Sequence, residues 1–167
     1  MAIRKKVCLL GAPGVGKTSL VRQFVSQTFS DEYLTTLGVK IERKIVDVDG
    51  TALTLMVWDV HGEEGSLVIN PTFLKGAAGF LLVIDGTRPE TSSSVVELTQ
   101  RLADREDSSS IVVATNKADL VDDWSAIDAS MAGHVSPDAV VRTSAMSGQG
   151  VEAAFGLLAS SILVGSK

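Results

Sequence analysis

Residues 11–18, Gly-Ala-Pro-Gly-Val-Gly-Lys-Thr, constrain the fold of this chain more than any other stretch. They follow the apolar run Val7–Leu10 and precede a helical pattern, which indicates the loop of a strand–loop–helix unit. Glycines let such a loop curl until several backbone N–H groups converge on one anion, and the following helix adds the positive end of its dipole. Lys17 adds a mobile positive charge, and the Thr18 hydroxyl is a ligand that Mg²⁺ accepts. The loop therefore predicts a site for a magnesium-bound polyphosphate.

Apolar runs alternate with helical patterns along the rest of the chain, as in an α/β domain. Asp49-Gly50 is a hairpin signal between the second and third runs, so that pair is expected to be antiparallel. The continuously apolar run Phe80–Ile84 is typical of a parallel strand buried on both faces. The predicted strands are Lys5–Leu10, Val39–Asp47, Ala52–Val60, Gly79–Asp85, Ile111–Thr115 and Ala139–Thr143.

Three apolar stripes at helical spacing predict the sides of helices that face the core. The stripes are Leu20, Val21, Phe24 and Val25, then Val95, Leu98 and Leu102, and finally Val151, Phe155, Leu158 and Ile162. The 167 residues are long enough for one domain with a real core, and helices are expected on both faces of the sheet.

Composition excludes several classes of function. The chain is 45% hydrophobic and 21% charged, with a formal net charge of −5, which is not the basic footprint of a nucleic-acid-binding protein. Cys8 is the only cysteine, so a disulfide within the chain is excluded and a buried thiol is expected. The sequence holds no signal-peptide pattern, no run long enough to span a bilayer and no lipidation cysteine at its C-terminus. We therefore expect a cytoplasmic protein without an intrinsic lipid anchor.

Asp59 and Gly62 follow the third apolar run and form a second candidate for polyphosphate chemistry. An aspartate that closes an apolar strand in a phosphate-loop protein holds Mg²⁺ through water. A glycine three residues later can bring its N–H close to a terminal phosphate. An Asp-containing turn after a strand is also common, so this motif by itself leaves both interpretations open.

The segment Asn116-Lys117-Ala118-Asp119 follows another apolar run and suits a purine base. A carboxylate such as Asp119 accepts two hydrogen bonds, and guanine offers a paired donor edge that adenine lacks. The Lys117 stem can lie over the base plane, and the N–H of Ala145 can meet the guanine O6. In isolation, a polar loop with a helix cap explains the same four residues.

Together and in order, these segments resemble the motifs of the Ras-like small GTPases, with residues 76–79 and 85–91 pointing to the Rab and Ras branches. The matching segments are Gly11–Thr18, Thr36–Val39, Trp58–Gly62, Asn116–Asp119 and Thr143–Ala145. The resemblance implies a P-loop NTPase (small G-protein) fold: a six-stranded mixed sheet in the order 2-3-1-4-5-6, with one antiparallel strand and about five helices. It also implies a single GTP-binding domain over residues 1–167, with Mg²⁺ as cofactor and GDP and GTP as ligands.

The resemblance further implies a role for each matching residue. The nucleotide-binding residues are Gly14, Val15, Gly16, Lys17, Thr18, Ser19, Phe29, Tyr33, Asn116, Lys117, Asp119, Ser144 and Ala145. The metal ligands are Thr18, Thr36 and Asp59, and the catalytic residues are Lys17, Thr36, Gly62 and Glu63. Regulatory and effector proteins are expected at two switch segments, around Thr36 and Gly62, and at the exposed edge of the second strand, Val39–Asp47.

Several residues depart from the family pattern, and two of them bear on hydrolysis. Glu63 stands where the family has a glutamine that orients the attacking water, and Ras-type enzymes gain about 10⁵-fold in rate with an activating partner. A glutamate with a pKa of about 4.3 is negative at neutral pH and is repelled by a triphosphate, which predicts slow hydrolysis. The opposing hypothesis is that Glu63 acts as a base or that Glu64 replaces it.

Pro13 is the second departure, and it stands where most relatives carry glycine. Its ring either crowds an arginine supplied by a partner or simply rigidifies the turn. Both departures keep open a second function, that of a nucleotide-bound scaffold that does not cycle.

Overall fold

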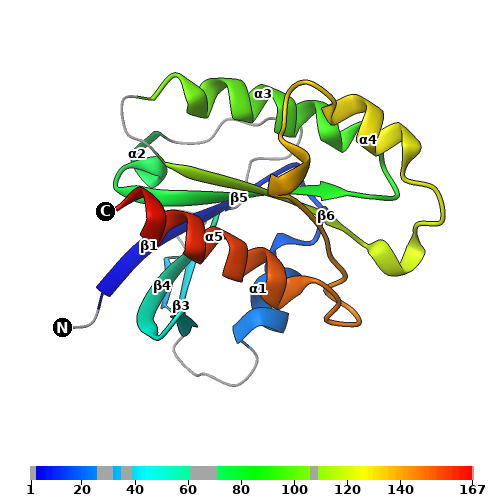
Figure 1. The fold of residues 1–167 in the computed structure, drawn as a ribbon. Helices are drawn as coiled ribbons and strands as arrows, with labels where there is room; N and C mark the ends of the chain where they lie inside the picture. Colours follow the sequence, from blue (N-terminus) through cyan, green and yellow to red (C-terminus); the bar gives the residue numbers. More distant parts are fainter. Residues whose placement is uncertain (1–2, 26–31, 35–38, 61–70, 106–108, 167) are drawn as a thin grey trace.

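A seven-stranded β-sheet forms the centre of the computed structural model (Figure 1), which describes residues 3–25, 32–34, 39–60, 71–105 and 109–166. The strands are β1 (Ile3–Leu10), β2 (Glu32–Leu34), β3 (Val39–Val48), β4 (Thr51–Val60), β5 (Ala77–Asp85), β6 (Ser110–Asn116) and β7 (Val140–Arg142). The α-helices within these ranges are α1 (Lys17–Val25), α2 (Pro71–Leu74), α3 (Thr91–Ala103), α4 (Ser125–Met131) and α5 (Val151–Gly165). Two short 3₁₀ helices are η1 (Ala118–Leu120) and η2 (Pro137–Ala139).

The strand order is β2-β3-β4-β1-β5-β6-β7, in which the six predicted strands keep their predicted order. β3 is antiparallel to both of its neighbours, and every other pair is parallel. The additional strand, β2, pairs Glu32–Leu34 with Val39–Ile41 of β3. A strand of three residues is too short to carry a recognisable alternation, which is why the sequence does not predict it.

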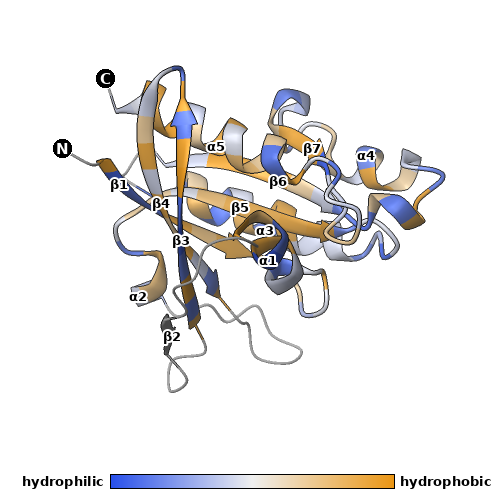
Figure 2. Cartoon of the chain, turned by 90° about the horizontal axis from the view of Figure 1, so that it is seen from below, coloured by the Kyte–Doolittle hydropathy of each residue, from blue (hydrophilic) through white to orange (hydrophobic). Residues whose placement is uncertain are grey.

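The second predicted strand is therefore exposed along only part of its outer edge. β2 occupies the edge of β3 at Val39–Ile41, and no described strand pairs with the outer edge of 42–48. Figure 2 shows hydrophilic colour along much of β3, whereas the neighbouring β4 is more hydrophobic. The expectation of an exposed edge over all of Val39–Asp47 is corrected to the half of the strand that follows Ile41.

The helices cover both faces of the sheet, as predicted (Figure 1). α1 and α5 pack on one face, where Phe24 and Phe155 stack with their ring centroids 3.8 Å apart. α2, α3 and α4 pack on the other face around Phe80, which is fully buried. All of the residues of the three predicted stripes are buried, so the helical spacing identified the core-facing sides correctly. This packing holds the carboxyl ends of the central strands in fixed positions.

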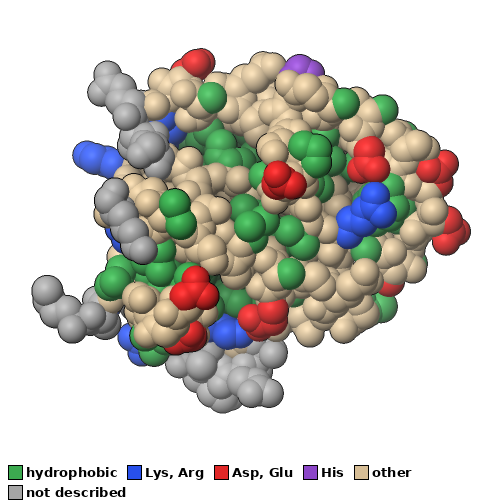
Figure 3. Space-filling model, in the orientation of Figure 1, with side chains coloured by type: hydrophobic (Ala, Val, Ile, Leu, Met, Phe, Trp, Pro, Cys, Tyr) green, Lys and Arg blue, Asp and Glu red, His purple; other side chains and the backbone are tan. Residues whose placement is uncertain are grey.

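Cys8 is fully buried in β1, as predicted, and its thiol donates to the backbone oxygen of Phe73 at 3.4 Å. Burial raises the pKa of this thiol to about 11, so it remains protonated at neutral pH. Among the described residues, no helix combines the length and the apolar character that a membrane crossing requires. Acidic and basic side chains are interspersed on the face drawn in Figure 3.

Candidate functional site

A cavity of about 430 Å³ lies at the carboxyl ends of β1 and β6, where an open α/β sheet binds its ligands. Its described lining is polar and comes mainly from the loop that joins β1 to α1. The lining residues are Pro13, Gly14, Gly16, Lys17, Thr18, Ser19 and Lys117. Six of these seven residues lie in or directly after the glycine-rich motif that the sequence singles out, so the predicted phosphate loop does line a cavity.

The backbone of this loop needs glycine at two positions. Gly14 and Gly16 have φ angles of +76° and +102°, a region that other residues rarely adopt. A Cβ atom on Gly16 would lie 2.3 Å from the Nδ2 atom of Asn116, which is a collision. Glycine therefore allows the loop to approach the end of β6 closely.

Lys17 begins α1 with only 7% of its surface exposed. Its ammonium donates hydrogen bonds to the backbone oxygens of Gly11 at 3.0 Å and Ala12 at 3.2 Å. Burial lowers the pKa of this lysine, and the Asp59 carboxylate offsets part of that effect. The cation therefore lies beside the cavity in surroundings that disfavour its charge, and a bound anion would stabilise it.

Thr18 and Asp59 meet although 41 residues separate them in the chain. The Thr18 hydroxyl donates to the Oδ2 atom of Asp59 at 2.6 Å, and Asp59 is 1% exposed at the end of β4. A hydroxyl and a carboxylate are hard oxygen ligands, the kind that Mg²⁺ takes together with the oxygens of a substrate phosphate. Two of the three predicted metal ligands are thus in contact.

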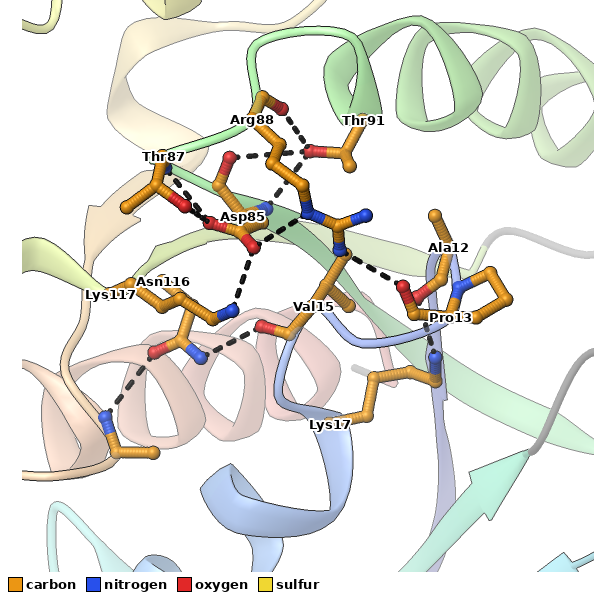
Figure 4. A network of polar contacts seen from close by, with 11 residues as sticks. Ala12, Pro13, Val15, Lys17, Asp85, Thr87, Arg88, Thr91, Asn116 and Lys117 are labelled. Atoms are coloured by element: carbon orange, nitrogen blue, oxygen red, sulfur yellow. Dashed lines mark hydrogen bonds and ion pairs between the residues drawn. The ribbon is translucent and has the colours of Figure 1, made fainter.

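Asn116 joins the loops that follow β6 and β7 to the phosphate loop. Its Nδ2 atom donates to the backbone oxygen of Val15 at 2.9 Å (Figure 4). Its Oδ1 atom accepts hydrogen bonds from the Thr143 hydroxyl at 3.1 Å and from the backbone N–H of Ala145 at 3.3 Å. Asn116 is 1% exposed, so these three partners satisfy a buried amide that would otherwise be costly.

Asp119 and Ser144 form the outer part of the same region. The Ser144 hydroxyl donates to the Oδ1 atom of Asp119 at 2.8 Å and leaves further acceptor positions on the carboxylate. The hydrogen bond joins η1 to the loop after β7. The geometry therefore brings together all of the described residues predicted at the purine, in one group beside the phosphate loop.

Lys117 adopts a left-handed conformation with a φ of 67°, which is unusual for a residue other than glycine. Its ammonium lies 2.8 Å from the Oδ2 atom of Asp85, the last residue of β5. Such backbone conformations cost about 1 kcal/mol or more and persist where the surroundings impose them. Here the ion pair with Asp85 holds the side chain across the cavity wall.

Sequence reasoning assigned no role to Asp85 or to the residues bonded to it, Thr87, Arg88 and Thr91 (Figure 4). Burial by itself would raise the pKa of the Asp85 carboxyl. Hydrogen bonds from Lys117, Thr87 and Arg88 outweigh burial and hold that pKa well below its usual range. A signal was present, because Asp85 closes an apolar strand just as Asp59 does.

Several predicted site residues lie outside the described part of the chain. These are Phe29, Thr36, Gly62 and Glu63, together with Glu64, the alternative to Glu63. Tyr33 belongs to β2 and lies opposite Lys40 of β3. Only the backbone of β2 is described. Their proposed roles stay predictions.

A glycine-rich loop joins a parallel strand to a helix, and carboxylates lie at the carboxyl ends of the two strands that flank it. This arrangement defines the class of P-loop α/β proteins. Residues 6–164 match the sequence model of the Ras family. The chain belongs to the Ras family.

Individual relatives agree with this assignment. Ras-related protein Rab-7b of Mus musculus is 41% identical over 121 residues, which cover 70% of this chain and 61% of that protein. Ras-related protein Rab-4A of Homo sapiens is 35% identical over 164 residues, or 95% of this chain and 74% of that protein. Ras-related protein Rab-1 of Theileria annulata is 32% identical over 162 residues, or 94% and 73%. The match to Rab-7b thus spans less than two thirds of that relative.

Proposed function

We propose that this chain is a guanine-nucleotide-binding molecular switch that hydrolyses GTP to GDP and phosphate, and that residues 1–167 act as one GTP-binding domain. The observation that carries the proposal is the hydrogen bond of 2.9 Å from Asn116 to Val15. It joins a phosphate-type loop to a purine-type loop, and residues of both loops line one cavity, so that a single ligand can contact both. Membership of the Ras family supports the same assignment.

Two groups of residues divide the work of binding. The phosphate end consists of residues 11–19 and Asp59, and its amides and Lys17 would hold the phosphates. The purine end consists of 116–119 and 143–145. There the Asp119 carboxylate would accept both donors of the guanine edge, which adenine cannot supply.

Thr18 and Asp59 fit a magnesium ion at the phosphate end, because both present hard oxygen ligands within hydrogen-bond distance of each other. Thr36 is the third proposed ligand. When bound, the ion would neutralise charge on the phosphate oxygens while the terminal phosphoryl group is transferred to water. The Thr18 hydroxyl can offer an oxygen lone pair to the ion while it still donates to Asp59, and Lys17 and the loop amides would stabilise the same developing charge.

Switching would depend on the segments around Thr36 and Gly62, which the third phosphate and the metal hold in order in GTPases of this type. Regulatory and effector proteins would bind these segments and the part of β3 that follows Ile41. The family assignment and the single buried thiol, which suits a reducing compartment, support action in the cytoplasm.

Slow hydrolysis follows from Glu63, whose negative charge would be repelled by the triphosphate. The competing candidate is a scaffold that keeps its nucleotide, and Glu63 and Pro13 make it a stronger candidate than in relatives with glutamine and glycine at these positions. A single-turnover measurement of phosphate release from GTP-loaded protein, with and without Mg²⁺, tests the enzyme directly. We expect slow, magnesium-dependent release that Glu63→Gln accelerates. A brisk rate that this substitution leaves unchanged would refute the role assigned to Glu63, and the absence of any release would favour the scaffold.

A further inference from the structure

Arg88 reaches from the turn between β5 and α3 to the phosphate loop, 75 residues away in the chain (Figure 4). The Nε atom of its guanidinium donates to the Oδ2 atom of Asp85 at 2.9 Å. Its Nη2 atom donates to the backbone oxygen of Pro13 at 3.0 Å. A planar guanidinium can bond to two acceptors at once in this way, whereas a lysine ammonium at the end of a flexible stem cannot reproduce the fork.

Asp85 connects Arg88 to the purine end. Its Oδ2 atom accepts from Arg88 and also lies 2.8 Å from the Lys117 ammonium, and its Oδ1 atom accepts both hydrogen bonds of Thr87. The carboxylate is 1% exposed on its side chain, so the two cations and Thr87 replace the solvent that it has lost. One buried carboxylate oxygen is therefore shared by a lysine that lines the cavity and an arginine that holds the phosphate loop.

Arg88 also occupies the space beside Gly14. A Cβ atom on Gly14 would lie 3.4 Å from its Nη2 atom, which is close contact. Pro13 has no N–H, and its carbonyl oxygen is bonded to Arg88. Pro13, Gly14 and Lys117 all line the cavity, whereas Arg88 is not among the described lining residues. The guanidinium thus supports a part of the cavity wall without being one of its described lining residues.

We propose that Arg88 is a positioning residue for nucleotide binding: with Asp85 it fixes the Pro13–Gly14 turn relative to Lys117 and so slows nucleotide release. This inference rests on the proposed function. The nucleotide would contact the turn and Lys117 together, and a ligand that bridges two loops dissociates faster when either loop moves away from it. The side chain of Arg88 is 41% exposed, so we expect a moderate effect.

The test is the rate at which fluorescently labelled GDP leaves the full chain in the presence of Mg²⁺ and excess unlabelled GDP. Arg88→Ala is expected to release GDP about fivefold faster than the wild type, in line with the loss of one ordinary hydrogen bond, because the arginine side chain is partly exposed. Arg88→Lys should also release it faster than the wild type, because an ammonium cannot bond to Asp85 and Pro13 with the same geometry.

Arg142→Ala is the matched control, since Arg142 makes an exposed ion pair of 3.2 Å with Asp128 and neither residue is among the described lining of the cavity. It should release GDP at the wild-type rate. Chemical denaturation of each nucleotide-free variant separates positioning from folding, because a purely structural arginine would lower the unfolding free energy and leave release unchanged.

The possible outcomes are distinct. A wild-type protein that never retains GDP refutes the proposed function itself. If the wild type retains GDP and both Arg88 variants release it at the wild-type rate, the proposed function stands and the positioning role is refuted. Equal acceleration in Arg142→Ala would also refute it. Should Arg88→Ala fail to fold, release from Arg88→Lys at the wild-type rate decides against the proposal, and faster release supports it.

Discussion

At the purine end, the polar side chains are bonded to one another, while at the phosphate end a buried cation lies beside the cavity. Asn116 has three protein partners, and Asp119 accepts from Ser144. Lys17, by contrast, donates to two carbonyls of its own loop, and Thr18 is bonded to Asp59. The fold itself therefore builds the purine end, whereas the phosphate end contains a buried charge that favours ligand binding more than folding.

The difference predicts that a substitution at each end will affect a different property. Residues of the purine end should affect both stability and recognition, because the same hydrogen bonds serve both. Residues of the phosphate end should affect recognition much more than stability, since a buried cation pays a desolvation cost when no anion is bound.

The largest effect is expected for Lys17→Met, which removes the cation and keeps an apolar side chain of similar length. Affinity for GDP should fall by about 100-fold or more, while the unfolding free energy of the nucleotide-free protein should hardly fall. Titration calorimetry and urea denaturation measure the two quantities. Lys44→Met is the control, because Lys44 bonds to Glu152 and Phe24 outside the cavity: it should lose stability and keep its affinity. A large loss of stability in Lys17→Met would contradict the comparison.

Asn116→Ala is expected to behave in the opposite way. It leaves the oxygen of Val15, the hydroxyl of Thr143 and the N–H of Ala145 without their partner, at a cost of about 2–3 kcal/mol in unfolding free energy. Denaturation of the nucleotide-free protein measures this loss. Ser93→Ala removes an exposed hydroxyl on α3 and should cost less than about 0.5 kcal/mol. If Asn116→Ala is no less stable than Ser93→Ala, the purine end is not built by these bonds.

Much of this contrast follows from the sequence, and the rest depends on contacts between distant residues. The glycine spacing and the adjacent lysine of the phosphate loop lie within eight residues, so the local sequence pattern was enough to predict it. The bond between Asn116 and Val15 joins residues 101 apart, and only the fold brings them together. Arg88 escaped prediction for the same reason: an arginine in a turn has no distinctive spacing, and its partner Pro13 lies 75 residues away, after another strand. β2 was missed because its pairing with β3 depends on tertiary context.

Asp119→Asn tests recognition at the purine end. It replaces an acceptor oxygen with an NH₂ group that would face a donor of guanine, so affinity for GDP should fall about 30-fold. Xanthosine diphosphate, which presents a carbonyl at that position, should bind this variant better than GDP does. Competition binding with the two nucleotides measures the exchange, and Asp128→Asn, on exposed α4, should change neither affinity. Unchanged preference for GDP in Asp119→Asn would remove Asp119 from the purine site.

The smallest effect is a difference in pH dependence between the two ends. The pKa of Asp85 is lowered in the folded protein, so its contribution is present above pH 4 and is lost as the pH falls toward the folded value. About 1 kcal/mol should disappear between pH 5 and pH 3. The lowered pKa of Lys17 means that its charge opposes folding, so stability again rises with pH, but at alkaline pH, as the lysine deprotonates. Denaturation of the nucleotide-free protein across pH checks both slopes. Asp85→Asn should lack the acid slope and Lys17→Met the alkaline one, and retention of either slope would contradict its assignment.

The central claim is that the phosphate end and the purine end hold one guanine nucleotide between them. Titration calorimetry of GDP and of ADP into nucleotide-free, folded protein with saturating Mg²⁺ tests it most directly. We predict tight binding of GDP and binding of ADP at least about 100-fold weaker, since adenine cannot satisfy Asp119. Equal affinity for the two nucleotides, or no heat with GDP, would contradict the claim.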